Sequence, residues 1–347
     1  MSEQLLIGFP ESVDALEDQL SCPPEDLIEK FASVDSDVVM LGVGGKMGPT
    51  MARMAHRCMQ QSGNPHKVFA VSRFSDPEVQ RRLNDWGLET ISCDLFDPQQ
   101  VKSLPDSRWV LNLAGFKFGA KTKPTMTWAT NCIIPSIVCN RYQGSNVLAF
   151  STGNVYPMVL PEGGGSLATD PPVPDGEYPM AALGRERMYE YFSEALETPI
   201  VIIRLNYATE LRYGVLQDIA QQVHDQQPVD VSMGYVNVIW LGDANAMTLR
   251  ALFTCQSPAR VLNMTGPDVL SVREMANQVG GMLDTPVSIS GTEAATALLN
   301  NSHASYPLIG VPQMGVEKML AWGSEWIRRG LPMYGKPTKF QVRDGVY

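Results

Sequence analysis

A glycine-rich turn at residues 41–49 has the spacing of a phosphate-binding loop and joins a predicted strand to a predicted helix. Glycines there let the backbone approach a pyrophosphate, which the helix N-terminus attracts. A nucleoside-triphosphate loop is excluded, because its motif would need glycine at Met40 and a hydroxyl residue at Met47. The G-x-x-G-x-x-G spacing therefore predicts a dinucleotide site; the alternative is that the glycines only let the helix pack. The residues of this predicted site are Gly42, Gly45, Lys46, Met47 and Gly48.

The end of the second predicted strand bears on the choice between NAD and NADP. Dinucleotide folds that prefer NAD usually place an acidic residue there, which binds the ribose 2′-hydroxyl. Here Ser72 and Arg73 occupy the position, and Lys46 lies in the glycine turn. Two cations and no carboxylate favour a 2′-phosphate, so NADP is the predicted cofactor and NAD the alternative. In the opposing interpretation Arg73 is a solvated surface charge and Asp76 turns back to the ribose.

Apolar and amphipathic segments alternate from residue 37 onward. Strands that are apolar throughout, each followed by a helix, are typical of a parallel sheet covered on both faces. The predicted fold class is therefore α/β, a doubly wound Rossmann-type sheet, which binds ligands at the carboxyl ends of its strands. The predicted strands are 38–41, 68–71, 89–92, 109–113, 147–150 and 200–203, and the helices between them are 47–61, 77–86, 125–141 and 178–196.

Three regions are predicted along the chain. Residues 1–35 form an acidic helical N-terminal extension, residues 36–206 the NAD(P)-binding domain, and residues 207–347 a smaller mixed α/β substrate domain, of which 236–265 is able to pack back on the first domain. The proline- and glycine-rich loop 157–177 follows a strand and is a candidate lid. The predicted helices of the substrate domain are 214–225, 242–255, 271–283 and 313–329.

Composition and charge exclude several classes of protein. The 347 residues carry a net charge of −10, of which −8 lies in residues 1–36, so there is no basic stripe and nucleic acid is not the predicted partner. No apolar run is long enough to span a membrane, and the acidic start is unlike a secretory or transit signal. The six cysteines and four histidines show no ligand spacing, so we predict no metal site and reduced thiols in the cytoplasm.

From about residue 37 to residue 265 the chain resembles the extended short-chain dehydrogenase/reductase family, also called the NAD-dependent epimerase/dehydratase family. Besides the glycine turn, the resemblance rests on Asp94-Leu95, Asn112-Leu113-Ala114-Gly115, Asn131, Phe150-Ser151-Thr152-Gly153-Asn154-Val155-Tyr156 and Arg204-Leu205-Asn206. It implies that further contacts to a dinucleotide cofactor are made by Asp94, Leu95, Ala114, Gly115, Asn131, Ser151 and Asn206.

The catalytic groups of this family are a Ser or Thr followed by Tyr-x-x-x-Lys. The resemblance assigns the hydroxyl to Thr152 and the tyrosine to Tyr178, but the lysine position holds Ala182. A tyrosine that transfers protons needs its pKa lowered from about 10, which the family's lysine achieves by its charge. Another cation has to substitute: Lys117, past the fourth strand, is the first candidate, and Arg185, seven residues beyond the tyrosine, is the second. The alternative is that both are surface charges.

The resemblance implies an NAD(P)-dependent oxidoreductase or epimerase that acts on a sugar, sugar acid or nucleotide sugar by hydride transfer. A dehydratase is disfavoured, since Gly153 and Asn154 replace the acidic pair of nucleotide-sugar dehydratases. The alternative is a non-catalytic NAD(P)-binding sensor, which the missing lysine favours. In the family, helices matching 125–141 and 178–196 form a four-helix dimer interface, so the resemblance also implies a homodimer.

Overall fold

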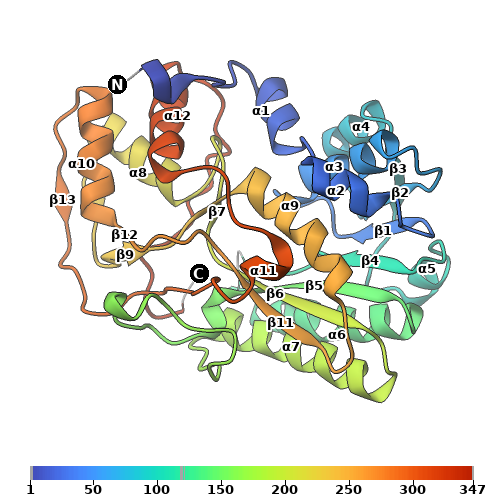
Figure 1. Cartoon of the computed structure of the whole chain (residues 1–347). Helices are drawn as coiled ribbons and strands as arrows, with labels where there is room; N and C mark the ends of the chain where they lie inside the picture. The colour runs from blue at the N-terminus through green and yellow to red at the C-terminus, as the bar shows by residue number, and fades with distance from the viewer. Residues whose placement is uncertain (1–2, 118–119, 121, 346–347) are drawn as a thin grey trace.

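The computed structural model describes residues 3–117, 120 and 122–345, and its centre is a parallel sheet with helices on both faces (Figure 1). Within these residues the strand order is β11-β6-β5-β4-β1-β2-β3, and neighbouring strands are parallel. The connections reverse direction between β1 and β4, which places the ligand-binding crevice of doubly wound folds at the carboxyl ends of these strands. The predicted fold class is confirmed. The strands of the sheet are β1 (Val38–Leu41), β2 (Val68–Ser72), β3 (Glu89–Ser92), β4 (Trp109–Asn112), β5 (Asn146–Thr152), β6 (Ile200–Leu205) and β11 (Arg260–Met264).

The predicted helices begin within three residues of their observed starts, whereas the short helices α5 and α11 were not predicted. The helices are α1 (Val13–Leu20), α2 (Glu25–Phe31), α3 (Gly48–Gln61), α4 (Pro77–Asp85), α5 (Pro98–Lys102), α6 (Pro124–Arg141), α7 (Glu177–Ala195), α8 (Val215–His224), α9 (Leu241–Ala251), α10 (Val272–Leu283), α11 (Tyr306–Ile309) and α12 (Val316–Arg328). The short strands outside the central sheet are β7 (Ala208–Thr209), β8 (Val229–Asp230), β9 (Tyr235–Val236), β10 (Ile239–Trp240), β12 (Leu270–Ser271) and β13 (Ile289–Ser290).

The two faces of the sheet bury different side chains, because successive residues of a strand point to opposite sides. Val38 of β1 lies in one buried cluster with Met51 of α3, on the face that α9 also covers (Figure 1). Its neighbour Val39 lies in a second cluster with Val138 of α6 and Tyr189 of α7. Burial on both faces explains why these strands are apolar throughout rather than alternating.

The chain leaves the central sheet for the substrate region, which is the part of residues 207–345 that lies outside this sheet, and then returns to the sheet. Strand β11 pairs with β6, with Val261 opposite Ile202, and α9 packs against α3. Segment 236–265 therefore supplies one strand of the central sheet and one helix that packs beside it. The remaining helices α8, α10 and α12 surround a separate apolar cluster, which forms the core of the substrate region.

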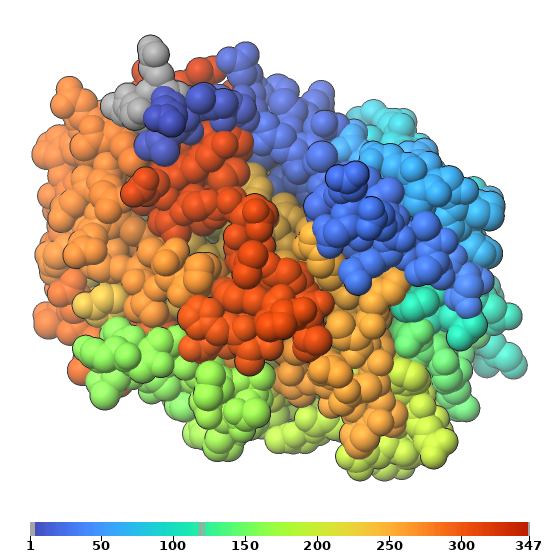
Figure 2. All heavy atoms as spheres, viewed as in Figure 1, coloured from blue at the N-terminus to red at the C-terminus, as the bar shows by residue number. Residues whose placement is uncertain are grey.

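The acidic N-terminal segment is built into this fold. Helix α1 contributes Leu16 and Leu20 to the core of the substrate region, and α2 contributes Leu27 and Phe31 to the core beside the sheet; all four are fully buried. In Figure 2 the segment, in dark blue, lies across both parts of the molecule. Its carboxylates pair with arginines of the body: Asp18 with Arg53 and Arg57, Asp26 with Arg250, Asp35 with Arg108, and Glu11 with Arg329.

The loop 157–177 is attached to the substrate region by hydrogen bonds. The backbone N–H of Val159 donates to Ala297 and that of Ser166 donates to Leu299, both at 2.9 Å. In this structure the loop predicted as a lid therefore packs against the substrate region. Among the described residues, no helix is long and apolar enough to cross a membrane.

Candidate functional site

Two cavities meet at the glycine turn, where the parallel strands end. The first cavity has a volume of about 420 Å³ and lies between the turn, the end of β5 and the substrate region. The second has a volume of about 540 Å³ and lies between the turn, the end of β2 and the loop after β3. Gly42, Gly45 and Gly115 line both cavities. The arrangement therefore suits an elongated ligand that crosses the glycine turn, as a dinucleotide does in doubly wound folds.

The glycine turn has no room for a side chain at two of its glycines. Gly42 has a φ of +80°, and a Cβ there would lie 2.7 Å from the backbone nitrogen of Ala114. At Gly48 a Cβ would lie 2.2 Å from the carbonyl oxygen of Val43. Helix α3 begins at Gly48 with Pro49 in its first turn, so its N-terminal N–H groups face the turn. This backbone cradle fits a pyrophosphate.

The second cavity holds most residues expected at the adenosine half of a cofactor. The Ser72 hydroxyl lies against the glycine turn, since a Cβ at Gly44 would be 2.7 Å from its oxygen. Asp76 also borders this cavity, but its carboxylate accepts a hydrogen bond from the backbone N–H of Glu78 and caps α4. The predicted cofactor residues that line it, besides the shared glycines, are Ser72, Arg73, Asp94, Leu95 and Ala114.

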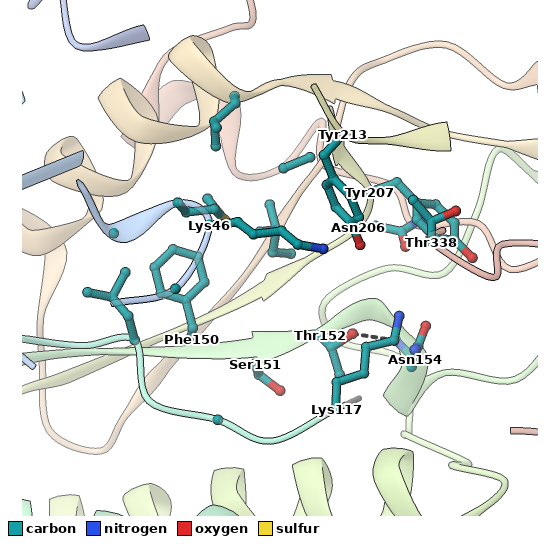
Figure 3. Close-up of a pocket in the computed structure, with 18 of the residues that line it drawn as sticks. Lys46, Lys117, Phe150, Ser151, Thr152, Asn154, Asn206, Tyr207, Tyr213 and Thr338 are labelled. Carbon is teal, nitrogen blue, oxygen red and sulfur yellow. Dashed lines mark hydrogen bonds between the residues drawn. The ribbon is translucent and has the colours of Figure 1, made fainter. Parts of the chain in front are cut away.

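Lys46 does not line the cavity that Arg73 lines. Its side chain enters the first cavity (Figure 3), where its Nζ lies 3.1 Å from the centroid of the Tyr213 ring. Burial, with the charges of Lys336 and Lys117, lowers the pKa of Lys46 to about 8. The two cations that were combined in favour of a 2′-phosphate thus lie in different cavities, and Arg73 alone carries that argument.

The structure brings the predicted catalytic residues Thr152, Tyr178, Lys117 and Arg185 together in the first cavity. Thr152 ends β5, and Tyr178 lies buried in the first turn of α7. The Lys117 Nζ lies 5.7 Å from the centroid of the Tyr178 ring. Burial, followed by the charge of Lys339, lowers the pKa of Lys117 to about 8. The cavity therefore combines the hydroxyl groups of Thr152 and Tyr178 with the amine of Lys117, whose pKa is about 8.

Arg185 supports the loop after β4. Its guanidinium donates to the carbonyl of Ala114 at 3.2 Å, and a Cβ at Gly115 would lie 2.6 Å from it. The buried Asn131 lies on the same side of Gly115 and does not line either cavity. Both side chains therefore contact the loop after β4, which borders both cavities. Arg185 also lines the first cavity.

A buried network fixes the end of β5. The hydroxyl of Ser151 donates to the carboxylate of Glu186, the residue that follows the tyrosine motif. Glu186 also pairs with Arg204, whose Nη2 lies 2.7 Å from Oε2, and Arg204 donates to the Tyr156 hydroxyl at 2.7 Å. These contacts explain why the sequence carries a glutamate and an arginine in otherwise apolar surroundings. The other predicted cofactor residues on the first cavity are Met47, Gly48, Ser151 and Asn206.

Ala182, at the position where the family has its lysine, is a packed core residue. Ala182 is fully buried and clusters with Val155 and Tyr156, the last residues of the strand-five motif. A longer side chain would have to displace these residues, so the alanine is part of the core. Among the described residues, no group of three or more His, Cys, Asp or Glu side chains could hold a metal ion.

Several residues that line the first cavity were not predicted. Asn154 lies within the strand-five motif, so that motif could have indicated it. Four further polar residues come from the substrate region, where no local pattern marks a site, and they reach the cavity only because the chain folds back on itself. These residues are Tyr207, Glu210, Tyr213 and Thr338.

The model of the NAD-dependent epimerase/dehydratase family matches residues 38–234. No curated protein matches the sequence. Among solved structures, the UDP-glucose 4-epimerase of Thermotoga maritima with UDP-glucose is 15% identical, covers 85% of this chain and 99% of its own, and has a TM-score of 0.70.

Two further solved structures have the same fold. The UDP-glucuronic acid 4-epimerase of Bacillus cereus, in complex with UDP-glucuronic acid and NAD, is 15% identical over 84% of this chain and 99% of its own, with a TM-score of 0.70. The dTDP-glucose 4,6-dehydratase of Bacillus anthracis, in complex with NAD, is 12% identical over 85% of this chain and 97% of its own, also with a TM-score of 0.70. At these identities the likeness establishes the fold.

Proposed function

Because this chain belongs to the NAD-dependent epimerase/dehydratase family, we propose that it is an NAD(P)-dependent oxidoreductase or epimerase. Its substrate class is a sugar, sugar acid or nucleotide sugar, in keeping with the UDP-sugar complexes of its structural neighbours. The observation that carries the proposal is the convergence of Thr152, Tyr178 and Lys117 on the cavity that opens from the glycine turn.

The residues present fit a dinucleotide. The backbone at Gly42 and Gly48 would hold the pyrophosphate, and the second cavity would hold the adenosine half beside Asp94 and Leu95. The bound nicotinamide would accept and return a hydride. Arg73 stands where an acidic residue would select NAD, and this favours NADP over NAD.

The residues that line the first cavity would carry out proton transfer. The deprotonated oxygen of Tyr178 would take the proton of a substrate hydroxyl as the carbon loses hydride, and Thr152 would hydrogen-bond the same substrate oxygen. The Lys117 ammonium, rather than a lysine at Ala182, would favour the tyrosinate by its positive charge. Arg185, which is hydrogen-bonded to Ala114, is the second candidate for this charge.

Elimination of water is disfavoured. A dehydratase needs an acid and a base beside the reacting carbons, and the two residues after Thr152 are Gly153 and Asn154. Glu210 lines the cavity, but its carboxylate is engaged by Arg212, whose Nε lies 3.0 Å from Oε1. Oxidation, reduction or epimerisation by transient oxidation therefore fits the first cavity better than dehydration.

A non-catalytic NAD(P)-binding sensor is the second candidate, and the observation that favours it is the buried Ala182 in place of the lysine. The experiment that separates the two candidates offers NAD and NADP, then UDP-glucose, UDP-glucuronic acid and dTDP-glucose, to the purified protein. The enzyme binds cofactor and converts or oxidises at least one of these sugars, with loss of conversion in Tyr178→Phe. Cofactor binding without conversion, unchanged by Tyr178→Phe, would favour the sensor.

A cytoplasmic homodimer is part of the proposal. Helices α6 and α7 pack against each other and leave large apolar side chains on the surface. Such a patch is typical of a surface that another subunit covers. The exposed apolar residues on these helices are Met126, Trp128, Ile133, Met180 and Tyr191.

A further inference from the structure

Glu17 of α1 is a carboxylate buried between two arginines. It is 1% exposed, and its Oε1 lies 2.8 Å from Nη1 of Arg212 and 2.8 Å from Nη1 of Arg82. Arg82 belongs to α4, beside the sheet, whereas Arg212 belongs to the substrate region. Glu17 thus joins the two parts of the molecule from a segment that lies outside the residues matched by the family model.

Arg212 continues this network to the wall of the first cavity. Its Nε lies 3.0 Å from Oε1 of Glu210, and its backbone N–H donates to Oε2 at 2.8 Å. Its guanidinium carbon lies 4.7 Å from the ring centroid of Tyr334, in the C-terminal segment. The side chains of Glu17, Arg212 and Glu210 are at most 4% exposed. Breaking a buried pair of this kind leaves an uncompensated charge and is strongly unfavourable.

Residues 209–214 form a tight hairpin, and Arg212 anchors it. The backbone groups of Glu210 and Tyr213 bond to each other at 2.8 and 3.1 Å. Gly214 has a φ of +136°, and a Cβ there would lie 2.0 Å from the Thr209 hydroxyl oxygen, so a side chain cannot be accommodated at the end of the hairpin. Glu210 and Tyr213 face the first cavity, where the Tyr213 ring lies under Lys46.

We propose that Glu17 is a positioning residue of the first cavity: it anchors Arg212 and so fixes the hairpin that presents Glu210 and Tyr213 to the substrate. Helix α1, which lies between α12 of the substrate region and α3 beside the sheet (Figure 1), then supports the site. The statement that the cavity receives a substrate rests on the proposed function; the anchoring does not.

The first test is amide hydrogen exchange of the full chain without cofactor. In Glu17→Gln the peptide covering 209–214 exchanges about tenfold faster than in the wild type, while β1 and β4 keep their protection, because a local anchor is lost. The matched control is Asp18→Asn, which removes one charge from the neighbouring residue of the same helix and leaves the hairpin unchanged. Asp18 is exposed and pairs with Arg53 and Arg57.

The second test reads the geometry of the cavity through Lys46, labelled with an amine-acylating reagent and quantified by mass spectrometry. The charges that act on its pKa are those of Lys336, Lys117, Asp218 and Glu210, the last two raising it. Burial is the largest cause of the lowered pKa of Lys46, and the Tyr213 ring covers its Nζ. When the hairpin loosens, the amine becomes hydrated, so its pKa and the labelling midpoint shift to higher pH in Glu17→Gln but not in Asp18→Asn. A merely structural role of Glu17 would not move this midpoint.

Equal hairpin exchange in both variants, or faster exchange spread evenly over the central strands, would overturn the proposal. If Glu17→Gln does not fold, Glu17→Asp is the second variant, since it keeps the charge on a shorter side chain. Amide exchange in its hairpin is expected to be threefold faster than in the wild type, which corresponds to about 0.65 kcal/mol. Exchange at the wild-type rate in Glu17→Asp would count against the anchor. Neither readout uses a cofactor. A wild type that binds neither NAD nor NADP would therefore defeat the proposed function while leaving this test intact.

Discussion

The Nζ of Lys117 lies 5.7 Å from the ring centroid of Tyr178, although Lys117 follows β4 and Tyr178 opens α7. The two residues are brought together because the carboxyl ends of parallel strands meet at one edge of the sheet. Ala182, one helical turn beyond Tyr178, is buried in the core and has no charge to offer. The cation beside the tyrosine thus comes from a different element than in a Tyr-x-x-x-Lys motif.

The first prediction concerns this pair. Lys117→Met lowers kcat by about a hundredfold and Tyr178→Phe by at least as much, because general acid–base catalysis contributes on this scale. The measurement is conversion of whichever nucleotide sugar the wild type accepts, followed by chromatography of the products. Lys102→Met, at an exposed position of α5 outside both cavities, keeps wild-type activity. If Lys117→Met keeps full kcat, Arg185 becomes the candidate cation.

The second prediction is a pH dependence of stability that needs no substrate. The pKa of Lys117 is lowered from 10.5 to about 8. Between these pH values the unfolded chain holds one more proton at this residue than the folded chain, so the free energy of unfolding rises with pH. Lys117→Met lacks this contribution. The difference in stability, wild type minus variant, measured by urea unfolding, therefore increases from pH 8 to pH 10.5 and is flat if the Lys117 pKa is normal.

The same titration predicts the alkaline limit of activity. Only the protonated amine can favour the tyrosinate by charge, so this assistance declines as pH rises through about 8. Lys117→Arg keeps its charge to much higher pH, because a guanidinium stays protonated in proteins. Its activity is therefore lost at higher pH than that of the wild type, and identical alkaline limits would show that Lys117 is not the titrating group.

Much of the sheet was predictable because its signals are local. Apolar runs such as Val38–Leu41, bounded by glycine or polar residues, mark strands without knowledge of their partners. The spacing of Gly42, Gly45 and Gly48 likewise reflects backbone crowding within a single turn, which the structure shows at Gly42 and Gly48. Motif and geometry therefore agree at the glycine turn.

The remaining part of the site depends on long-range contacts. Glu210 and Tyr213 reach the cavity on a hairpin whose Arg212 donates a hydrogen bond to Glu17. Arg212 and Glu17 are 195 residues apart in the sequence. Thr338 reaches it through hydrogen bonds to Asp218. No residue type at these positions indicates the cavity, because the contacts arise only when separate parts of the chain fold together. The ion pairs of the acidic N-terminus could not be predicted for the same reason, because its arginine partners are scattered along the sequence.

The third prediction tests whether Ala182 is a packing residue. Ala182→Lys does not restore a family-like site; it lowers the free energy of unfolding by about 2 kcal/mol or more, because overpacking and a buried amine both cost stability. Thermal or urea unfolding measures the change. Ala195→Lys, at the exposed last residue of the same helix, leaves stability nearly unchanged. Wild-type stability in Ala182→Lys would mean that the lysine pocket persists beside Tyr178.

The fourth prediction concerns cofactor choice. Arg73→Ala weakens NADP binding about tenfold and leaves NAD binding unchanged, since a charge-assisted contact to a phosphate contributes on the order of 1.5 kcal/mol or more. Calorimetric titration with both cofactors gives the ratio of affinities. Arg81→Ala removes an exposed arginine of α4 that pairs with Glu78, and it leaves both affinities unchanged. Equal losses for NAD and NADP in Arg73→Ala would contradict a role in recognising the 2′-phosphate.

The fifth prediction addresses assembly. Ile133 of α6 is 49% exposed and belongs to the apolar surface of α6 and α7. A carboxylate at this position would be desolvated in a dimer interface, so Ile133→Asp shifts the protein to the monomer, as read by light scattering over a concentration series. Asn140→Asp introduces the same charge at an exposed position near the end of the helix and keeps the assembly state of the wild type. A wild type that is already monomeric would contradict the proposed homodimer, and its apolar α6–α7 surface would then need another partner.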